Sequence, residues 1–448
     1  MDFIKEFDTT INLWGNGDII KAISESSEED VFEFAETMAL ISKYHFSEDS
    51  KPNENFSFVA NSSLSGGSHP CSDPGCRKRN IDNLCSFATL YADEVYIQNP
   101  FENLILRGGP EIREVDRQEL IAGVFNYLYL RPLIDRGVIK YATNMMAFCE
   151  QHMESIAKPL SDSILKKEKR LKTLLHTNLL DHCSVIFNYP KGNDQNPFFE
   201  ISGPDELIEH GSIYFYAYDP APSIFSKFQK KGESYALSRD EIEENEILRH
   251  IIDPIINDLS MQEWHSALRG TSYLCDNKAQ MKVATKLNNK AYAANATAFE
   301  RGMQHYLPAI FSKDVGSIVS LRDREEEAFF VYRDKVHTMM MESKSWDEDE
   351  VSRIFRDQIL PEINIIDKKV KDWKSNTKES IAEKLIFGTG AVTVGLYAGF
   401  LPSDIGSIVA ALGGGSAVAG SFMDYNKTFK EKQEARSNDF YFLWQASK

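Results

Sequence analysis

Two apolar stretches near the end of the chain stand out against a polar background. Residues 385–401 and 405–423 are joined by Pro402, Ser403 and Asp404, and Asp404 is the only charged residue between positions 385 and 423. A helix needs about 17 to 25 apolar residues to cross the hydrocarbon core of a bilayer. Each stretch is therefore long enough to predict one membrane-spanning helix, and together they predict a helical hairpin.

Small residues recur within this hairpin at four-residue spacing, a pattern that lets two helix backbones approach closely. These packing positions are Gly395, Gly399, Ala411, Gly415, Ser416 and Gly420. Lysine-rich flanks at 368–384 and 427–436 predict that both ends stay on the cytoplasmic side of an inner membrane. The segment also fits a buried hairpin in a soluble bundle, because glycine weakens helices in water. A third possibility is a soluble protein that buries the hairpin and inserts it into the membrane after an activating signal.

Upstream, the pattern alternates between helical and strand periodicity. Apolar residues at helical spacing predict helices, and short β-branched or aromatic runs predict strands. Helices are expected at 28–44, 117–133 and 154–180, and strands at 87–97, 137–141, 184–189, 198–202 and 212–218. A run of Ser, Asn, Gly and Pro at 47–70 predicts a loop or linker. This order indicates an α/β or α+β region.

From residue 238 onward the pattern is mainly helical. Helices are expected at 240–259, where Pro254 should kink or split the helix, and at 277–287, 320–341 and 346–374, with a short strand at 272–274. The predicted organisation is an N-terminal helix and polar loop (1–70), an α/β region (71–235), a helical module (236–384), the apolar hairpin (385–423) and an aromatic tail (424–448).

Charge and cysteine content narrow the function classes. The 448-residue chain has a formal net charge of −17, which argues against general binding to nucleic-acid backbones. The basic run at 166–172 has an apolar helical face, so it predicts a solvated helix surface or a local binding patch. The N-terminal residues lack a secretory signal, and six cysteines are too few for a disulfide scaffold. We expect a cytoplasmic protein, with association to the inner membrane as the alternative.

Cysteine spacing suggests a structural zinc site. Cys71 and Cys76 flank a Pro-Gly turn, and Cys149 and His152 form a Cys-x-x-His pair. Four such ligands in a tetrahedron would make a closed, structural zinc site. His69 and Cys85 are spare ligands. The alternative is a set of ordinary reduced cysteines, since nothing in the sequence shows that the two halves meet.

Acidic residues offer a weaker catalytic hypothesis. Asp93 and Glu94 are expected at a strand end, and further acids follow at Glu102, Glu111, Glu114 and Asp116. Clustered carboxylates can hold the divalent metal of a nuclease. The chain lacks the glycine-rich phosphate loops Gly-x-x-x-x-Gly-Lys-Ser/Thr and Gly-x-Gly-x-x-Gly, and also lacks His-Glu-x-x-His and Gly-x-Ser-x-Gly. The sequence therefore leaves enzymatic activity open, with a non-enzymatic role favoured.

This plan resembles that of bacterial proteins, some encoded beside phage-defence genes, that join an α/β sensory region to a membrane-active helical tail. The resemblance implies a sensor and effector that recognises a protein partner or assembles as a homo-oligomer, and that acts through its hairpin. One alternative is a metal-dependent nuclease with the hairpin as buried core. Another is a soluble scaffold that binds a partner through the aromatic residues at 438–448.

Overall fold

The computed structural model describes most of the first two thirds of the chain. The described residues are 3–47, 57–107, 111–145, 147–191, 196–204, 207–208, 211–217, 224, 232–269, 271–277, 280, 308–311, 315–324, 326, 330–331, 353, 357 and 386–389. They divide into two compact units, the first containing residues 1–147, 265–276 and 290–448, and the second residues 148–264 and 277–289. The first unit is thus interrupted by the second. The predicted boundary between residues 235 and 236 falls inside the second unit.

A parallel four-stranded sheet lies at the centre of the first unit, in the order β3-β2-β1-β8. Its strands are β1 (Ser57–Ala60), β2 (Glu94–Gln98), β3 (Ile139–Ala142) and β8 (Ser272–Leu274). Phe58 lies opposite both Val95 of β2 and Ser272 of β8, so β1 is a central strand. The expectation of a loop throughout 47–70 was wrong at β1. This strand has four residues, and all of them are buried. Its sequence therefore shows no alternation of apolar and polar residues.

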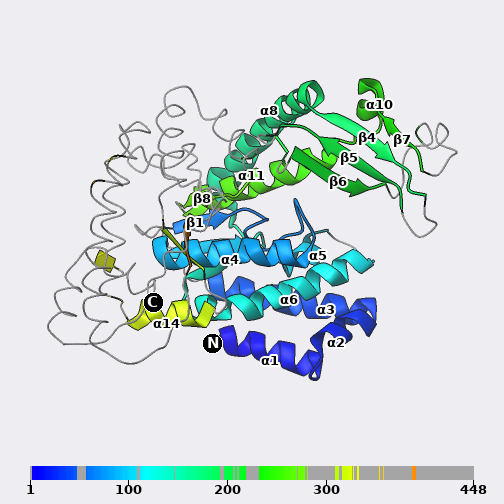
Figure 1. Ribbon diagram of the computed structural model, residues 1–448. Coiled ribbons are helices and arrows are strands. Elements are labelled where there is room, and N and C mark those ends of the chain that lie inside the picture. The colour runs from blue at the N-terminus through cyan, green and yellow to red at the C-terminus, as the bar shows by residue number, and fades with distance from the viewer. Residues whose placement is uncertain are drawn as a thin grey trace, which may run out of the picture. The chain divides into compact units, whose positions relative to one another are not determined.

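Helices of the first unit pack on one face of this sheet (Figure 1). They are α1 (Phe3–Gly15), α2 (Ile19–Glu25), α3 (Glu28–Ser47), α4 (Pro74–Tyr91), α5 (Glu102–Arg107) and α6 (Glu114–Asp135). Alternate strand residues such as Phe58, Val95 and Ile139 share one buried cluster with these helices. Aromatic rings extend that core, with Phe7 centred 4.7 Å from Tyr127 and 5.4 Å from Phe101.

Helix α4 corrects one prediction. A strand was expected at 87–97, but the chain stays helical to Tyr91 and β2 begins at Glu94. Leu84, Phe87 and Ala88 lie at helical spacing and are all buried. Burial of this face outweighs the preference of Phe, Thr and Tyr for strands. Helices α3 and α6 and strand β3 confirm the predictions at 28–44, 117–133 and 137–141.

Three C-terminal elements belong to the first unit. Helix α14 (Val315–Arg324) packs against α6 and α4, and its Val315 and Val319 join the core. Strand β9 (Pro308–Phe311) packs against α4 and pairs in antiparallel register with β10 (Ile386–Thr389). The four residues of β10 lie at the start of the predicted apolar helix at 385–401, so they differ from that expectation. Ile and Phe favour strands when a pairing edge is present.

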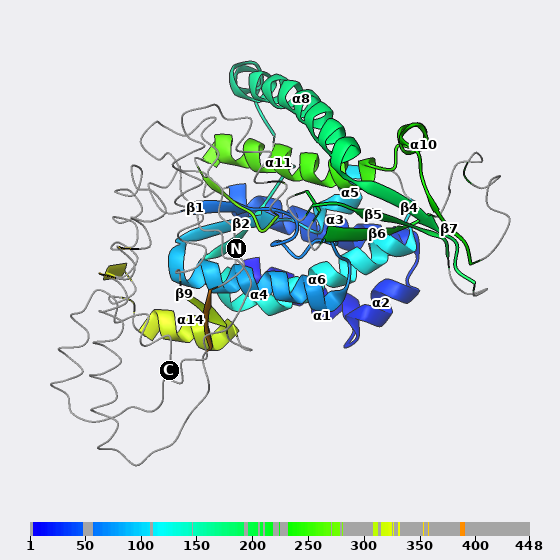
Figure 2. The ribbon, with the colours of Figure 1, turned by 45° about the horizontal axis from the view of Figure 1, so that its top comes forward.

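The second unit is an antiparallel sheet with helices at its ends (Figure 2). The strand order is β6-β5-β4-β7. Its elements are α7 (Glu150–His152), the π-helical turn η1 (Met153–Ala157), α8 (Lys158–His182), β4 (Ser184–Asn188), β5 (Phe198–Ser202), β6 (Ser212–Tyr216), β7 (Ser234–Ala236), α10 (Arg239–Glu244) and most of α11 (Arg249–Arg269). The residues of α11 from His265 onward belong to the first unit. The predicted strands at 184–189, 198–202 and 212–218 are confirmed.

The helix expected at 240–259 is divided between α10 and α11. The division lies before Arg249 rather than at Pro254, which sits in the second turn of α11. Helix α10 begins with a capping box, in which the Ser238 hydroxyl accepts from the Glu241 N–H and the Glu241 carboxylate accepts from the Ser238 N–H. The chain leaves the helix after Glu244, where Asn245 is the C-cap and Glu246 adopts a positive φ of 48°.

Candidate functional site

The carboxyl ends of the four parallel strands all lie at one edge of the first unit's sheet. From β1 the chain proceeds through α4 to the neighbouring strand β2, whereas β8 lies on the other side of β1. In open parallel sheets, ligands bind where connections diverge from two adjacent strands in this way. The segments that follow β1 and β8 are therefore the first place to look for functional side chains.

Asp276 is the centre of a polar cluster at this place. Its Oδ1 accepts a hydrogen bond from Asn61 Nδ2 at 2.8 Å, and its Oδ2 accepts one from the Ser63 hydroxyl at 2.7 Å. Asn80 of α4 donates from Nδ2 to Ser63 Oγ at 2.7 Å. Two segments that are distant in the sequence thus meet at one carboxyl group, and α4 joins them through the bond from Asn80 to Ser63. We call Asn61, Ser63, Asn80 and Asp276 the Asp276 cluster.

The loop after β1 is held in place by its own polar side chains. Asn61 N–H donates to Leu274 O at 2.9 Å, which continues the pairing of β1 with β8. Asn61 Oδ1 accepts from the Leu64 N–H at 3.2 Å, and the Ser65 hydroxyl donates to Asn61 O at 2.8 Å. Ser65 Oγ also accepts from the Gln98 N–H at 3.0 Å, which ties the loop to the end of β2. These bonds explain why the segment is rich in Asn and Ser.

Gly66 ends this loop in a conformation that other residues rarely adopt. Its φ is +81°, and a Cβ atom added there would lie 2.3 Å from Asn126 Nδ2 and 2.8 Å from Ile81 Cδ1. Arg77 Nε donates to Gly66 O at 2.8 Å. Both the left-handed backbone and the close neighbours require glycine at this position.

Burial raises the pKa of the Asp276 carboxyl group, while the hydrogen bonds from Asn61 and Ser63 oppose that rise. A carboxyl group removed from water favours its neutral form unless donors or cations stabilise the charge. The side-chain donors of Asn61 and Ser63 are both neutral groups. Asp276 is therefore a group that a ligand with hydrogen-bond donors would stabilise.

A second buried carboxyl group, Glu102, lies after β2. It is 1% exposed, and it accepts hydrogen bonds from the Thr143 hydroxyl and, at 2.8 Å, from the Asn144 N–H. Burial raises its pKa, and these donors oppose the rise. Asn144 Oδ1 lies 3.2 Å from Nε2 of the buried His265. The chain Glu102–Asn144–His265 brings two titratable groups to this edge.

Acidic side chains already bind the arginine and the helix N-terminus that lie near the loop after β1. Arg77 pairs with Glu119 at 2.9 Å, and its side chain is 12% exposed. Asp73 caps α4 by accepting from the Gly75 and Cys76 N–H groups at 2.9 and 3.2 Å. A carboxylate therefore occupies the helix N-terminus where a phosphate would otherwise bind. The donor set suits hydroxyl and amino groups better than phosphate.

The predicted zinc ligands fall into two pairs, one in each unit. Cys71 and Cys76 are side-chain neighbours, and Cys71 has its pKa raised chiefly by partial burial. Cys149 Sγ lies 3.3 Å from His152 Nδ1. Within the described ranges, no group of three or more His, Cys, Asp or Glu side chains is placed to hold a metal ion. Of the spare ligands, Cys85 is buried in the core of the first unit, and burial lowers the pKa of His69 to about 4.

Two of the candidate nuclease acids lie at the opposite edge of the sheet from the Asp276 cluster. Asp93 and Glu94 precede β2 or begin it, so they are at the amino ends of the parallel strands. Glu94 pairs with Lys140 at 2.6 Å, and the two side chains are 15% and 11% exposed. Glu114 and Asp116 belong to the first turn of α6, and Glu111 is exposed just before it. Glu102 follows the carboxyl end of β2, so it lies at the other edge of the sheet from Asp93 and Glu94.

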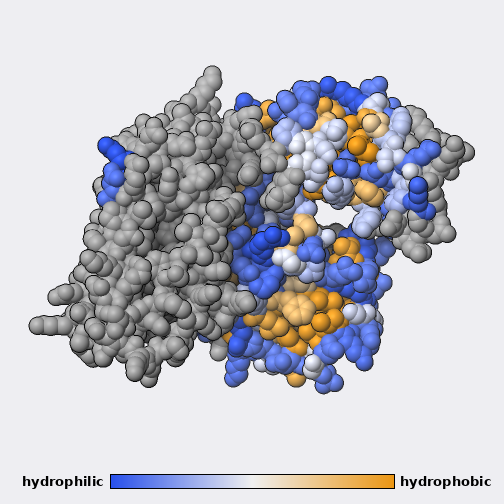
Figure 3. Space-filling model, viewed as in Figure 1, coloured by the Kyte–Doolittle hydropathy of each residue, from blue (hydrophilic) through white to orange (hydrophobic). Residues whose placement is uncertain are grey.

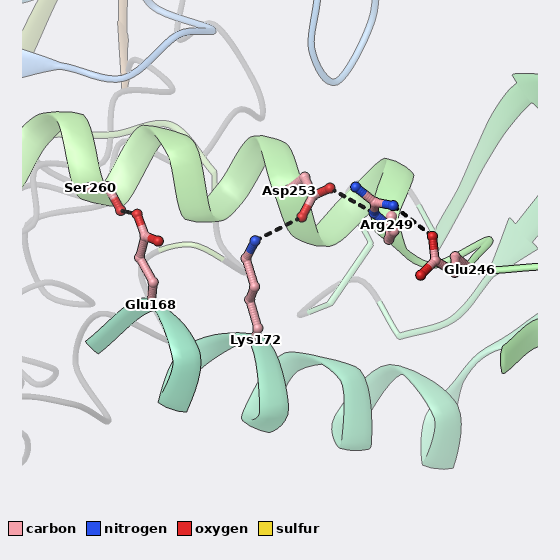
Figure 4. A network of polar contacts seen from close by, with 6 residues as sticks. All are labelled: Glu168, Lys172, Glu246, Arg249, Asp253 and Ser260. Carbon is pink, nitrogen blue, oxygen red and sulfur yellow. Dashed lines mark hydrogen bonds and ion pairs between the residues drawn. The ribbon is translucent and has the colours of Figure 1, made fainter. Parts of the chain in front are cut away.

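The basic run at 166–172 forms part of the contact between α8 and α11. Lys172 pairs with Asp253 at 3.3 Å, and the Ser260 hydroxyl donates to Glu168 at 2.6 Å (Figure 4). Lys167 also pairs with Glu263. Acids of α11 therefore pair with Lys167 and Lys172, two of the basic residues of this run.

The predicted packing residues of the hairpin, from Gly395 to Gly420, and the aromatic residues at 438–448 lie outside the described part of the chain. In the ranges that are described, none of the helices combines the length and apolar character that crossing a bilayer requires.

Comparison with known proteins gives no match: no family model, no curated protein and no solved structure corresponds to this chain. Of the residues at this edge, Glu102 was among the predicted acids, whereas Asn61, Ser63, Asn80, Asp276 and His265 were not predicted. Two signals pointed to this edge. A short apolar run at 58–60 is followed by an Asn, Ser and Gly segment, and Tyr273 and Leu274 are followed by Cys275 and Asp276.

Proposed function

We propose that the protein is a sensor and effector whose first unit binds a small polar molecule at the Asp276 cluster. The observation that carries the proposal is the meeting of Asn61, Ser63 and Asp276 between the carboxyl ends of β1 and β8. Parallel sheets with this strand order use the same position for ligands. The likeness to other parallel sheets supports only the position of the site, and its chemistry follows from the residues found there.

The residues favour a ligand with hydroxyl or amino groups, such as a nucleoside. Asp276 offers carboxylate oxygens, and Asn61 and Ser63 carry both donors and acceptors. Acidic side chains beside such crevices accept hydrogen bonds from ribose hydroxyls. Arg77 is held by Glu119, and Asp73 caps α4. A free phosphate group would therefore meet more acids than bases.

The effector step of the proposal involves the C-terminal third of the chain. Helix α4 begins after the ligand loop and contributes Asn80 to the cluster. Strand β9 and helix α14 pack against α4, and β9 pairs with β10 at the start of the predicted hairpin. A ligand that binds one arrangement of α4 better than another would shift the population of this C-terminal contact. The hairpin would then reach the inner membrane or a second copy of the chain.

Thermal unfolding of the full chain with adenosine, guanosine, cytidine or uridine tests the ligand step. At least one nucleoside at saturating concentration is expected to raise the melting temperature by about 5 to 10 °C. Inorganic phosphate should leave it unchanged. Asp276→Asn, which keeps the size of the side chain, should abolish the nucleoside effect, whereas Asp135→Asn at the exposed end of α6 should retain it.

The effector step has a separate readout in the same samples. Release of a dye from anionic liposomes is expected to rise with the active nucleoside and to need both Asp276 and residues 385–423. If no nucleoside changes the melting temperature, or if Asp276→Asn responds like the wild type, the proposed site is wrong. If binding occurs without leakage or oligomerisation, the effector step is wrong and the site stands.

A further inference from the structure

The second unit presents a sheet face that is separate from the Asp276 cluster. Side chains on β5 alternate, with Phe199 and Ile201 buried and Phe198, Glu200 and Ser202 partly exposed. Strand register places Tyr216 beside Phe198 and Tyr214 beside Glu200 on the same face. We call this the outer face of the antiparallel sheet. Its register positions are Ser184, Ile186, Asn188, Phe198, Glu200, Ser202, Ser212, Tyr214, Tyr216, Ser234 and Ala236.

Aromatic side chains gather at one corner of the outer face. Tyr214 and Tyr216 are 60% and 59% exposed, the largest exposures among the aromatic side chains described. The rings of Phe198 and Tyr214 meet edge to face, with centroids 6.0 Å apart. Glu200 lies beside them, with Oε1 at 3.5 Å from the Tyr214 hydroxyl. Three rings and a carboxylate therefore share one solvent-facing surface.

We propose that this aromatic and acidic corner binds lysine or arginine side chains of a basic peptide. The faces of aromatic rings attract cations, and a neighbouring carboxylate adds a charged hydrogen-bond acceptor. Large exposed rings grouped on one strand are also typical of interaction surfaces. Phe198, Tyr214 and Tyr216 would contact the side-chain cations, and Glu200 would pair with one of them.

Charge complementarity selects this partner over a nucleic acid. Single-stranded nucleic acids also stack on aromatic residues, but they need a positively charged groove along the backbone. The register positions of the outer face include Glu200 and no Lys or Arg. The chain as a whole carries a net charge of −17, which attracts a basic partner and repels a polyanion. Lys167 and Lys172 on α8 are paired with acids of α11.

Fluorescence anisotropy with the full chain tests the proposal directly. The probe is a short fluorescein-labelled peptide of alternating Arg and Ser, with a Glu and Ser peptide and a uridine oligonucleotide as alternative ligands. The Arg peptide should bind, and Tyr214→Leu, Tyr216→Leu and Glu200→Gln should each weaken its binding by about 2- to 30-fold. Tyr214→Phe should bind like the wild type, because it keeps the ring.

Matched variants separate this site from general attraction to an acidic protein. Glu243→Gln removes one charge from α10 in the same unit, and Leu165→Ala removes an apolar side chain that is 58% exposed on α8. Both should bind the Arg peptide like the wild type. The proposal is overturned if the outer-face variants behave like these controls. It is also overturned if the Glu peptide binds equally well, or if the uridine oligonucleotide alone shows dependence on Tyr214 and Tyr216.

Discussion

At the scale of single residues, polar side chains define the ends of the parallel strands. Asn61 uses its amide oxygen for the Leu64 N–H and its amide nitrogen for Asp276. Ser63 donates to Asp276 and accepts from Asn80. Buried polar groups cost stability unless they form such bonds. The cluster is therefore specified in detail and sensitive to single substitutions.

His69 gives a prediction about pH. Its Nε2 is buried without a hydrogen-bond partner among the described residues, and burial lowers its pKa to about 4. The unfolded chain binds this proton at a pKa of about 6.5. The neutral His69 side chain therefore makes its full contribution to the free energy of unfolding above about pH 6.5. This contribution is lost as the pH falls toward about 4.

Urea unfolding of the wild type and His69→Gln between pH 7 and pH 4 measures this effect. The wild type should lose more unfolding free energy than the variant, by at most about 3 kcal/mol. His182→Gln, at an exposed position at the end of α8, should follow the wild type. Parallel curves for wild type and His69→Gln would contradict the burial of a neutral imidazole.

At the scale of elements, long periodic helices and alternating strands were predictable, and short buried strands were not. The pattern predicted α3, α6, α8 and the antiparallel strands β4, β5 and β6 because each has a clear apolar period, whereas the three-residue strand β7 was not predicted. Strand β1 has four residues, all of them buried, so it gives no alternation. The C-terminal half of α4 reads as a strand by composition, and only its packing on the sheet makes it a helix.

The apolar pattern of α6 did not predict which of its apolar residues are exposed. Phe125 and Leu128 of α6 are 48% and 44% exposed, and apolar surface is visible over α6 in Figure 3. Helical periodicity placed these residues on a helix correctly. It did not tell which apolar positions face the core, because α6 has apolar residues on more than one side.

The turn that follows β1 gives a prediction at the level of an element. Gly66→Ala should lower the free energy of unfolding by about 2 to 4 kcal/mol, because it strains a left-handed backbone and crowds Asn126. Gly17 also has positive φ, at +91°, but an added Cβ would have nothing within 4 Å. Gly17→Ala should therefore cost about 1 kcal/mol. Equal losses in urea unfolding would show that Asn126 and Ile81 do not restrict the turn.

At the scale of the whole molecule, sequence reasoning predicted a mixed α/β region but not its interruption. The second unit lies between β3 and β8 in the sequence, so Phe58 pairs with Ser272 across a separation that leaves no local signal. For the same reason Asp276 could not be connected with Asn61 and Ser63 beforehand. Glu102 was identified only as one acid among several.

Contacts of α14 with the rest of the first unit support the proposed effector step. Val319 of α14 is buried in the core of the first unit, and Arg322 donates to Ala88 O of α4 at 3.2 Å. Arg136, the C-cap residue of α6, pairs with Asp323 at 2.5 Å. Helix α14 thus contacts α4 and α6 near their C-terminal ends. A shift of α4 on ligand binding would therefore alter its contacts with α14 and β9.

Hydrogen exchange of the full chain, with and without the nucleoside that most raises the melting temperature, tests this central claim most directly. The account predicts slower exchange at residues 61–67 and 272–277, together with changed exchange at 308–324, and neither effect in Asp276→Asn. Unchanged exchange at 61–67 and 272–277 would contradict the proposed site. Protection there with no change at 308–324 would contradict the coupling between that site and the C-terminal third.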